Sequence, residues 1–160
     1  MTNAIFKTTG NYGYARAAVV MSTQSETVFE WSVKVLCDSG FRVGIASQLR
    51  QEANEIDGYD ENAILYGTHN GGSSNPGITV GSNRIHSHPA QAKYGDVVNF
   101  RFQPQTKKFV VRLVRISKFS QTNFQVKNEH EYEIDLRDNV NYYAVVQSLS
   151  NAKPEALLLA

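Results

Sequence analysis

Apolar and polar residues alternate along two short stretches in the first third of the chain. In VFEWSVKVL every second residue from Phe29 to Val35 is apolar, and the residues between them are polar. FRVGIASQL repeats this period from Phe41 to Ile45. Successive side chains of a strand point to opposite faces, so each stretch predicts a strand with one buried face. The DSG turn between them predicts that the two strands pair as an antiparallel hairpin.

A second pair of strands is predicted in AKYGDVVNFRFQPQTKKFVVRLVR, residues 92–115. The apolar positions on one face of each strand are Val98, Phe100 and Phe102, then Phe109, Val111 and Leu113. The polar turn QPQTKK joins the strands and predicts a hairpin. Gly95 and Asp96 stand where the chain enters the first strand, which suits a turn with positive φ or a side chain that caps the backbone. We assign this stretch to the scaffold.

Further short runs of the same kind continue to the end of the chain. They are YARAAVVMS, NAILYGT, NFQVKN, EYEIDL and NYYAVVQSL, and most are separated by Gly, Asn, Asp or Ser. Many short strands predict an all-β sandwich or barrel with little helix. The tail KPEALLLA stays open, because Pro154 could begin a helix while the apolar run after it could equally form a closing strand. We find no repeat or linker, so residues 1–160 are expected to form one domain.

The net charge of the chain bears on which classes of partner it could attract. The chain has 16 Lys and Arg against 15 Asp and Glu, a formal net charge of +1. This balance gives neither nucleic acid nor an anionic membrane a general electrostatic reason to bind. Arg115 and the other basic residues of the second hairpin are assigned to the wet side or the ends of strands. With no apolar run that could cross a bilayer and no secretory signal, a soluble cytoplasmic protein is expected.

The ordered set of strand motifs resembles the SPRY domain, the core of the B30.2 module. The matching elements, from about Tyr14 to Leu159, are FEWSVKV, FRVGIAS, ILYGTHNG, YGDVVNFRFQPQTKKFVV and YYAVVQSLS. The order Glu30-Trp31, reversed from the usual one, and Ala144 in place of a frequent Pro mark a divergent member. The resemblance implies a bent β-sandwich of two antiparallel sheets, a concanavalin-like jelly roll.

The same resemblance implies a function. SPRY domains are protein-interaction modules without catalysis that read a peptide or a protein surface with loops at one edge of the sandwich. Aromatic and arginine side chains supply much of the binding energy in interfaces. We predict a pocket for a protein or short peptide formed by loop residues Tyr59, Tyr66, Asn70, Arg84 and Tyr142. No cofactor is implied, and no phosphate loop, nucleophile elbow or HExxH motif points to an enzyme.

Two alternatives stay open. Aromatic side chains beside Asn, Asp and His could also stack on sugar rings, which would make the domain a lectin-like sandwich. The other alternative rests on RIHSHP, where His86 and His88 would project from the same face of a strand. Jelly-roll metalloenzymes of the cupin type use that spacing to bind a metal. The glutamate that a cupin places a few residues later is missing here, so this alternative ranks last.

Overall fold

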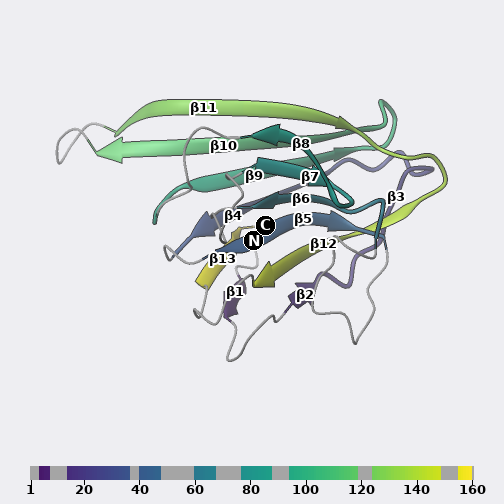
Figure 1. The fold of residues 1–160 in the computed structure, drawn as a ribbon, viewed down its shortest axis with the longest axis horizontal. Coiled ribbons are helices and arrows are strands. Elements are labelled where there is room, and N and C mark those ends of the chain that lie inside the picture. Colours follow the sequence, from purple (N-terminus) through teal and green to yellow (C-terminus); the bar gives the residue numbers. More distant parts are fainter. Residues whose placement is uncertain are drawn as a thin grey trace.

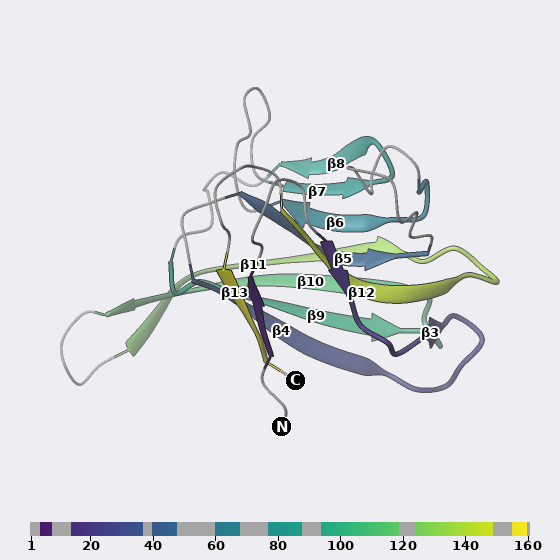
Figure 2. The ribbon, with the colours of Figure 1, turned by 90° about the horizontal axis from the view of Figure 1, so that it is seen from below.

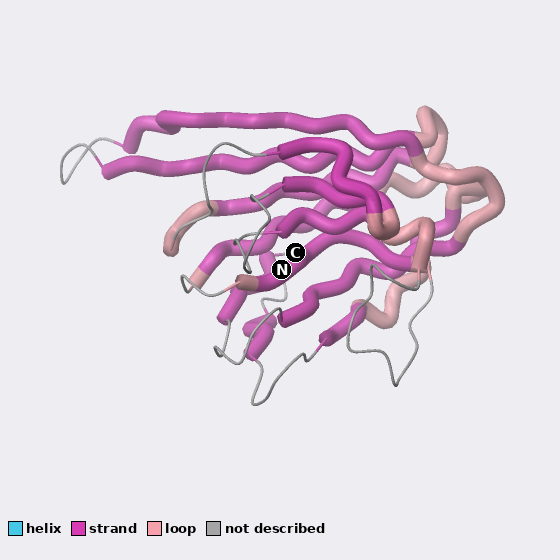
Figure 3. The backbone as a smooth tube through the Cα atoms, viewed as in Figure 1, coloured by secondary structure: helices cyan, strands magenta, loops and turns pink. Residues whose placement is uncertain are grey.

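A computed structural model gives the arrangement of most of the chain. It describes residues 4–7, 14–36, 40–47, 60–67, 77–87, 94–118, 124–148 and 155–159. Every regular element in these ranges is a strand, as Figures 1 and 3 show. The predicted all-β fold is therefore confirmed. The described part contains no helix of the length and apolar character that crossing a membrane requires.

The strands form two antiparallel sheets. Sheet A has six strands in the order β1-β13-β4-β9-β10-β11. Their bounds are β1 Ala4–Lys7, β13 Glu155–Leu159, β4 Phe29–Val35, β9 Val97–Gln103, β10 Lys108–Lys118 and β11 Phe124–Asp135. The C-terminal tail is thus a closing strand, inserted between β1 and β4. The two runs NFQVKN and EYEIDL form a single long strand, β11.

Sheet B has seven strands, with the main order β2-β12-β5-β6-β7-β8 and with β3 paired to β12. Their bounds are β2 Tyr14–Arg16, β12 Asn141–Ser148, β5 Phe41–Ala46, β6 Ile64–Gly67, β7 Gly77–Val80, β8 Asn83–Ser87 and β3 Met21–Ser22. Figure 2 shows the two sheets as stacked layers, with β8 at one edge of sheet B. The predicted bent sandwich of two antiparallel sheets is confirmed.

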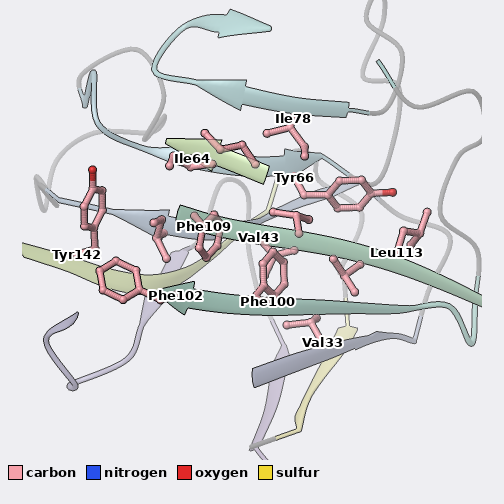
Figure 4. Close-up of a cluster of buried hydrophobic side chains, with 14 of the residues drawn as sticks. Val33, Val43, Ile64, Tyr66, Ile78, Phe100, Phe102, Phe109, Leu113 and Tyr142 are labelled. Atoms are coloured by element: carbon pink, nitrogen blue, oxygen red, sulfur yellow. The ribbon is translucent and has the colours of Figure 1, made fainter. Parts of the chain in front are cut away.

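The core lies between the sheets and is rich in aromatic rings. The Phe100 ring stacks on Trp31 with centroids 5.3 Å apart and on Phe109 at 5.7 Å. Phe102 of sheet A meets Tyr142 of sheet B at 5.8 Å, so this contact joins the layers (Figure 4). The rings of Trp31, Phe100, Phe102 and Phe109 lie on the face of each strand that the period-two pattern predicts to be buried. Such pairs contribute about 0.5–1.5 kcal/mol each beyond the burial of their area.

The first predicted hairpin is wrong. β4 pairs with β9 and β13 in sheet A, whereas β5 pairs with β12 and β6 in sheet B. The two strands face each other across the core, where Val33 and Val43 are both buried. Period-two alternation predicts which face of a strand is buried, but it does not choose between a neighbour in the same sheet and one in the opposite sheet.

The second hairpin is confirmed. β9 and β10 pair antiparallel from Gln103↔Lys108 to Val97↔Val114. Gly95 has φ 91°, the positive φ predicted for the turn that precedes β9. Backbone hydrogen bonds from Gly95 N to Val35 O and from Val35 N to Asp96 O fasten this turn to the end of β4. The three central strands of sheet A, β4, β9 and β10, therefore form one continuous, well-registered surface.

Candidate functional site

A hollow of about 560 Å³ lies on the outer face of sheet A, away from the core. It crosses four neighbouring strands, β4, β9, β10 and β11. Its lining consists of Glu30, Trp31, Ser32, Asn99, Phe100, Arg101, Gln103, Val110, Arg112, Glu131 and Glu133. Because strands rather than loops supply these residues, the shape of the hollow is set by the sheet.

The alternation of each strand explains why this face is polar. In β9, Val98, Phe100 and Phe102 are buried in the core, so the residues between them project outward. Pairing then brings outward residues of separate strands into rows. Asn99 is opposite Ser32 on β4 and opposite Arg112 on β10. The hollow is the solvent face of a half-buried sheet, with its side chains held at fixed spacing.

Hydrogen bonds and ion pairs organise the floor of the hollow. The Ser32 hydroxyl donates to Asn99 Oδ1 at 2.6 Å, near the centre. Arg101 forms an ion pair with Glu30 on one side. On the other side Arg112 pairs with Glu129, and this hydrogen-bonded carboxylate raises the pKa of Arg112. The side chains are partly ordered before any ligand arrives, which lowers the entropic cost of binding.

The lining carries an excess of negative charge. It includes three glutamates and two arginines, and Glu129 just outside it neutralises one of those arginines. Glu131 and Glu133 are exposed and form no ion pair with any residue that the structure describes. Two carboxylates on the β11 side are therefore available to a cationic ligand.

The chemistry of the hollow suits binding. It presents hydroxyl, amide, guanidinium and carboxylate groups that can pair with a peptide or with hydroxyl groups of a ligand. Its lining includes neither histidine nor cysteine. Across the described residues, no three His, Cys, Asp or Glu side chains gather in a way that could hold a metal ion.

Two of the predicted pocket residues are placed in the core instead. Tyr66, on β6, and Tyr142, on β12, are each only 1% exposed (Figure 4). The expectation that they are exposed loop residues is wrong. Tyr66 shares the buried phase of Ile64 two residues earlier, and the Tyr142 hydroxyl accepts a hydrogen bond from Arg137 N at 3.3 Å. Strand alternation predicts that Tyr66 is buried. Its polar hydroxyl group suggested exposure instead.

Of the other three predicted pocket residues, the structure describes only Arg84. Arg84 is exposed, but it lies on β8, the edge strand of sheet B, and not in a loop, so its contact role stays a prediction. Tyr59 and Asn70 lie outside the described residues, so their role stays a prediction. His88 also lies outside them. The His86 ring packs on Tyr132 of β11 with centroids 4.8 Å apart, which joins the free edges of the two sheets.

One polar pair escaped the sequence analysis. Asp96 is 3% exposed, and Arg115 reaches it through Nε at 3.2 Å to both carboxylate oxygens and through a terminal nitrogen at 2.8 Å. The Arg115 side chain is only 21% exposed, so its assignment to the wet side or end of a strand is wrong. This carboxylate raises the pKa of Arg115. The pair ties the start of β9 to β10 at one end of the sandwich.

The buried tyrosines predict a loss of stability in alkaline solution. Burial raises the pKa of Tyr66, Tyr132 and Tyr142, and for Tyr66 the negative charge of Asp96 adds to the effect. The folded state thus holds these phenols neutral where the unfolded chain ionises them. Their contribution is complete below about pH 10, the ordinary tyrosine pKa, and is lost as the pH rises through the raised values.

Thermal unfolding followed from about pH 8 to about pH 11.5 checks this expectation. The Tyr142→Phe variant should begin about 1 kcal/mol less stable, because the Arg137 amide loses its acceptor. It should then lose less stability than the parent above about pH 10, since it lacks one tyrosine whose pKa is raised in the folded state. Parallel curves for the two proteins would contradict the assignment of Tyr142.

Comparisons with known proteins bear on the fold. No protein-family model matches the chain, and no curated protein sequence matches it. Among solved structures, the SPRY domain of human HERC1 aligns over 97% of this chain and 87% of its own, with TM-score 0.63 and 13% identity. A lectin, UEA-II, solved in complex with galactose, aligns over 95% of this chain and 82% of its own, with TM-score 0.56 and 12% identity.

A further structural neighbour is the basic winged bean lectin, solved with Tn-antigen. It covers 99% of both chains with TM-score 0.51 and 10% identity. At these identities the likeness concerns the fold alone. The resemblance to SPRY domains predicted from the sequence is confirmed at that level, and lectins share the same two-layer architecture.

Proposed function

We propose that this protein is a non-catalytic interaction module that binds a polypeptide segment, with the hollow of sheet A as the binding surface. The observation that carries the proposal is a polar hollow built on four registered strands around the Ser32–Asn99 hydrogen bond. The fold shared with a SPRY domain supports it. The proposed partner is a protein or short peptide, with neither nucleic acid nor a membrane as a target, and a cytoplasmic location remains a prediction.

The lining favours a peptide over a sugar. The rings of Trp31 and Phe100, although they contribute to the wall, stack on each other and on Phe109 in the core. The part of the lining that faces outward is instead charged and amide-bearing, which suits the backbone and side chains of an extended chain. Tyr59, Asn70 and Arg84 stay candidate contacts from the loops and the β8 edge.

A matched pair of variants tests the hollow. Peptides selected from a random octapeptide library on the wild-type protein would be measured by calorimetry against Asn99→Ala and Gln24→Ala. Both changes remove an amide that makes one side-chain hydrogen bond of 2.6 Å, but Gln24 bonds Asn139 on another surface. We expect Asn99→Ala to weaken binding about tenfold and Gln24→Ala to leave it unchanged. Equal affinities for the two variants would contradict the proposed site.

A second candidate function is the binding of a sugar. The hydroxyl and amide at the centre of the hollow could pair with sugar hydroxyl groups, and two structural neighbours are lectins, one solved with galactose and one with Tn-antigen. A glycan array separates the candidates. Selective binding of glycans that Asn99→Ala abolishes would favour the lectin function over the peptide function.

A further inference from the structure

The long strand β11 forms a free edge of sheet A. Within the described residues it is hydrogen-bonded to a strand on one side only, through β10. Its other side therefore presents a row of backbone N–H and C=O groups. Such an edge is a template for pairing with another strand. Figure 1 shows β11 running along the margin of the molecule, beside the hollow-forming strands.

The outer face of this edge carries alternating carboxylates. Glu129, Glu131, Glu133 and Asp135 occupy every second position and are all exposed. Glu129 and Asp135 at the two ends are paired with Arg112 and Lys108 of β10. The central two, Glu131 and Glu133, have no such partner among the described residues and also line the hollow. Glu131 lies opposite Arg112 in the register with β10, but both carboxylates are exposed and can meet side chains of a strand laid beside β11.

The inner face of the same edge carries His130, Tyr132 and Ile134, which lie opposite the core residues of β10. Tyr132, between the two free carboxylates, is half-buried and packs on His86 of β8. β8 is itself the edge strand of sheet B. A strand added to β11 would hence place one set of side chains near carboxylates and the other set near Tyr132.

A second copy of this chain does not fit the edge. Antiparallel pairing of two β11 strands would bring one row of carboxylates against the other, and like charges directly opposite each other destabilise a strand pair. The same row of carboxylates therefore disfavours pairing of β11 with β11 of a second copy. The charge complement of the edge is a strand with Lys or Arg at alternate positions.

We propose that β11 is a docking edge for an extended basic segment of another protein, which adds a strand to sheet A and sets cationic side chains over Glu131 and Glu133. The inference rests on the proposed function and names the kind of partner for the β11 edge, which adjoins the hollow through Glu131 and Glu133. Alternate residues of that segment are apolar, since they face Tyr132. The main-chain hydrogen bonds supply affinity, and the two carboxylates select the sequence.

Three synthetic peptides with the pattern Lys-Val-Lys-Val-Lys-Val-Lys test the backbone pairing by calorimetry on the full chain. One is unmodified, one carries N-methyl groups on the valines, and one carries them on the lysines. In a strand the N–H groups of alternate residues point to opposite sides, so only one methylated peptide blocks pairing with β11. We expect that peptide to bind at least about tenfold more weakly and the other to bind as the unmodified peptide does.

Charge variants test whether Glu131 and Glu133 select a basic segment. E131Q/E133Q should weaken the unmodified peptide about fivefold, while E26Q/E61Q, which removes two exposed carboxylates elsewhere, should leave its affinity unchanged. Equal binding by both methylated peptides would overturn the edge pairing while leaving the hollow to be judged by Asn99→Ala. Equal effects of the two double variants would overturn the selection of a basic segment.

Discussion

Replacing Gly44 with alanine is expected to lower the free energy of unfolding by more than about 3 kcal/mol. Gly44 lies in the middle of β5, where β6 passes so close that an added Cβ would overlap the carbonyl oxygen of Ile64. The neighbouring atoms belong to the backbone of a paired strand and cannot rotate away. The methyl group must therefore push β5 and β6 apart in a closely packed sandwich.

Gly67, in the adjacent strand β6, supplies the control. A Cβ there would meet only Gly77 O, at 3.9 Å, an ordinary contact. Gly67→Ala should change stability by less than about 1 kcal/mol, and it could raise it, because glycine weakens a strand. Urea unfolding of Gly44→Ala and Gly67→Ala measures the two changes in stability. Similar midpoints would show that the close approach of β5 to β6 is absent.

Much of the scaffold follows from alternation alone. Each of β4, β5, β9 and β10 buries the face that its apolar residues predict, and the positive φ of Gly95 follows from its place before a strand. Partner choice does not follow in the same way. β4 pairs with β9 and β13, strands that lie far along the chain, and nothing local distinguishes them from the nearby β5. Sheet membership is decided by packing over the whole molecule.

The candidate site was harder to predict, for two physical reasons. Tyr66 and Tyr142 carry a polar tip that suggests exposure, yet both rings fill the core. The hollow of sheet A combines residues from four strands whose order is not local, so Ser32 and Asn99 become partners only once β4 and β9 are aligned. Alternation predicts which side chains of each strand project outward, but it does not predict which of them become neighbours across the sheet.

Removing the carboxylate of Asp96 is expected to cost about 2–3 kcal/mol of unfolding free energy. Asp96→Ala would leave the Arg115 guanidinium largely buried with its bidentate partner gone. Losing one partner of a fully buried pair costs more, but Arg115 keeps 21% of its side-chain surface, so water screens part of the charge. By contrast, Glu30→Ala breaks an exposed pair with Arg101 and should cost at most about 1 kcal/mol.

A double variant shows whether the loss arises from the Arg115 charge once its bond to Asp96 is gone. Replacing both groups, as Asp96→Ala with Arg115→Met, should bring stability back to within about 1 kcal/mol of the parent, because both charges of the pair are then removed. Additive losses in the cycle would mean that the two side chains act independently. Backbone pairing with β4 and β10 also holds β9, so the same double variant should keep the Asn99 row in place and retain peptide binding in the hollow.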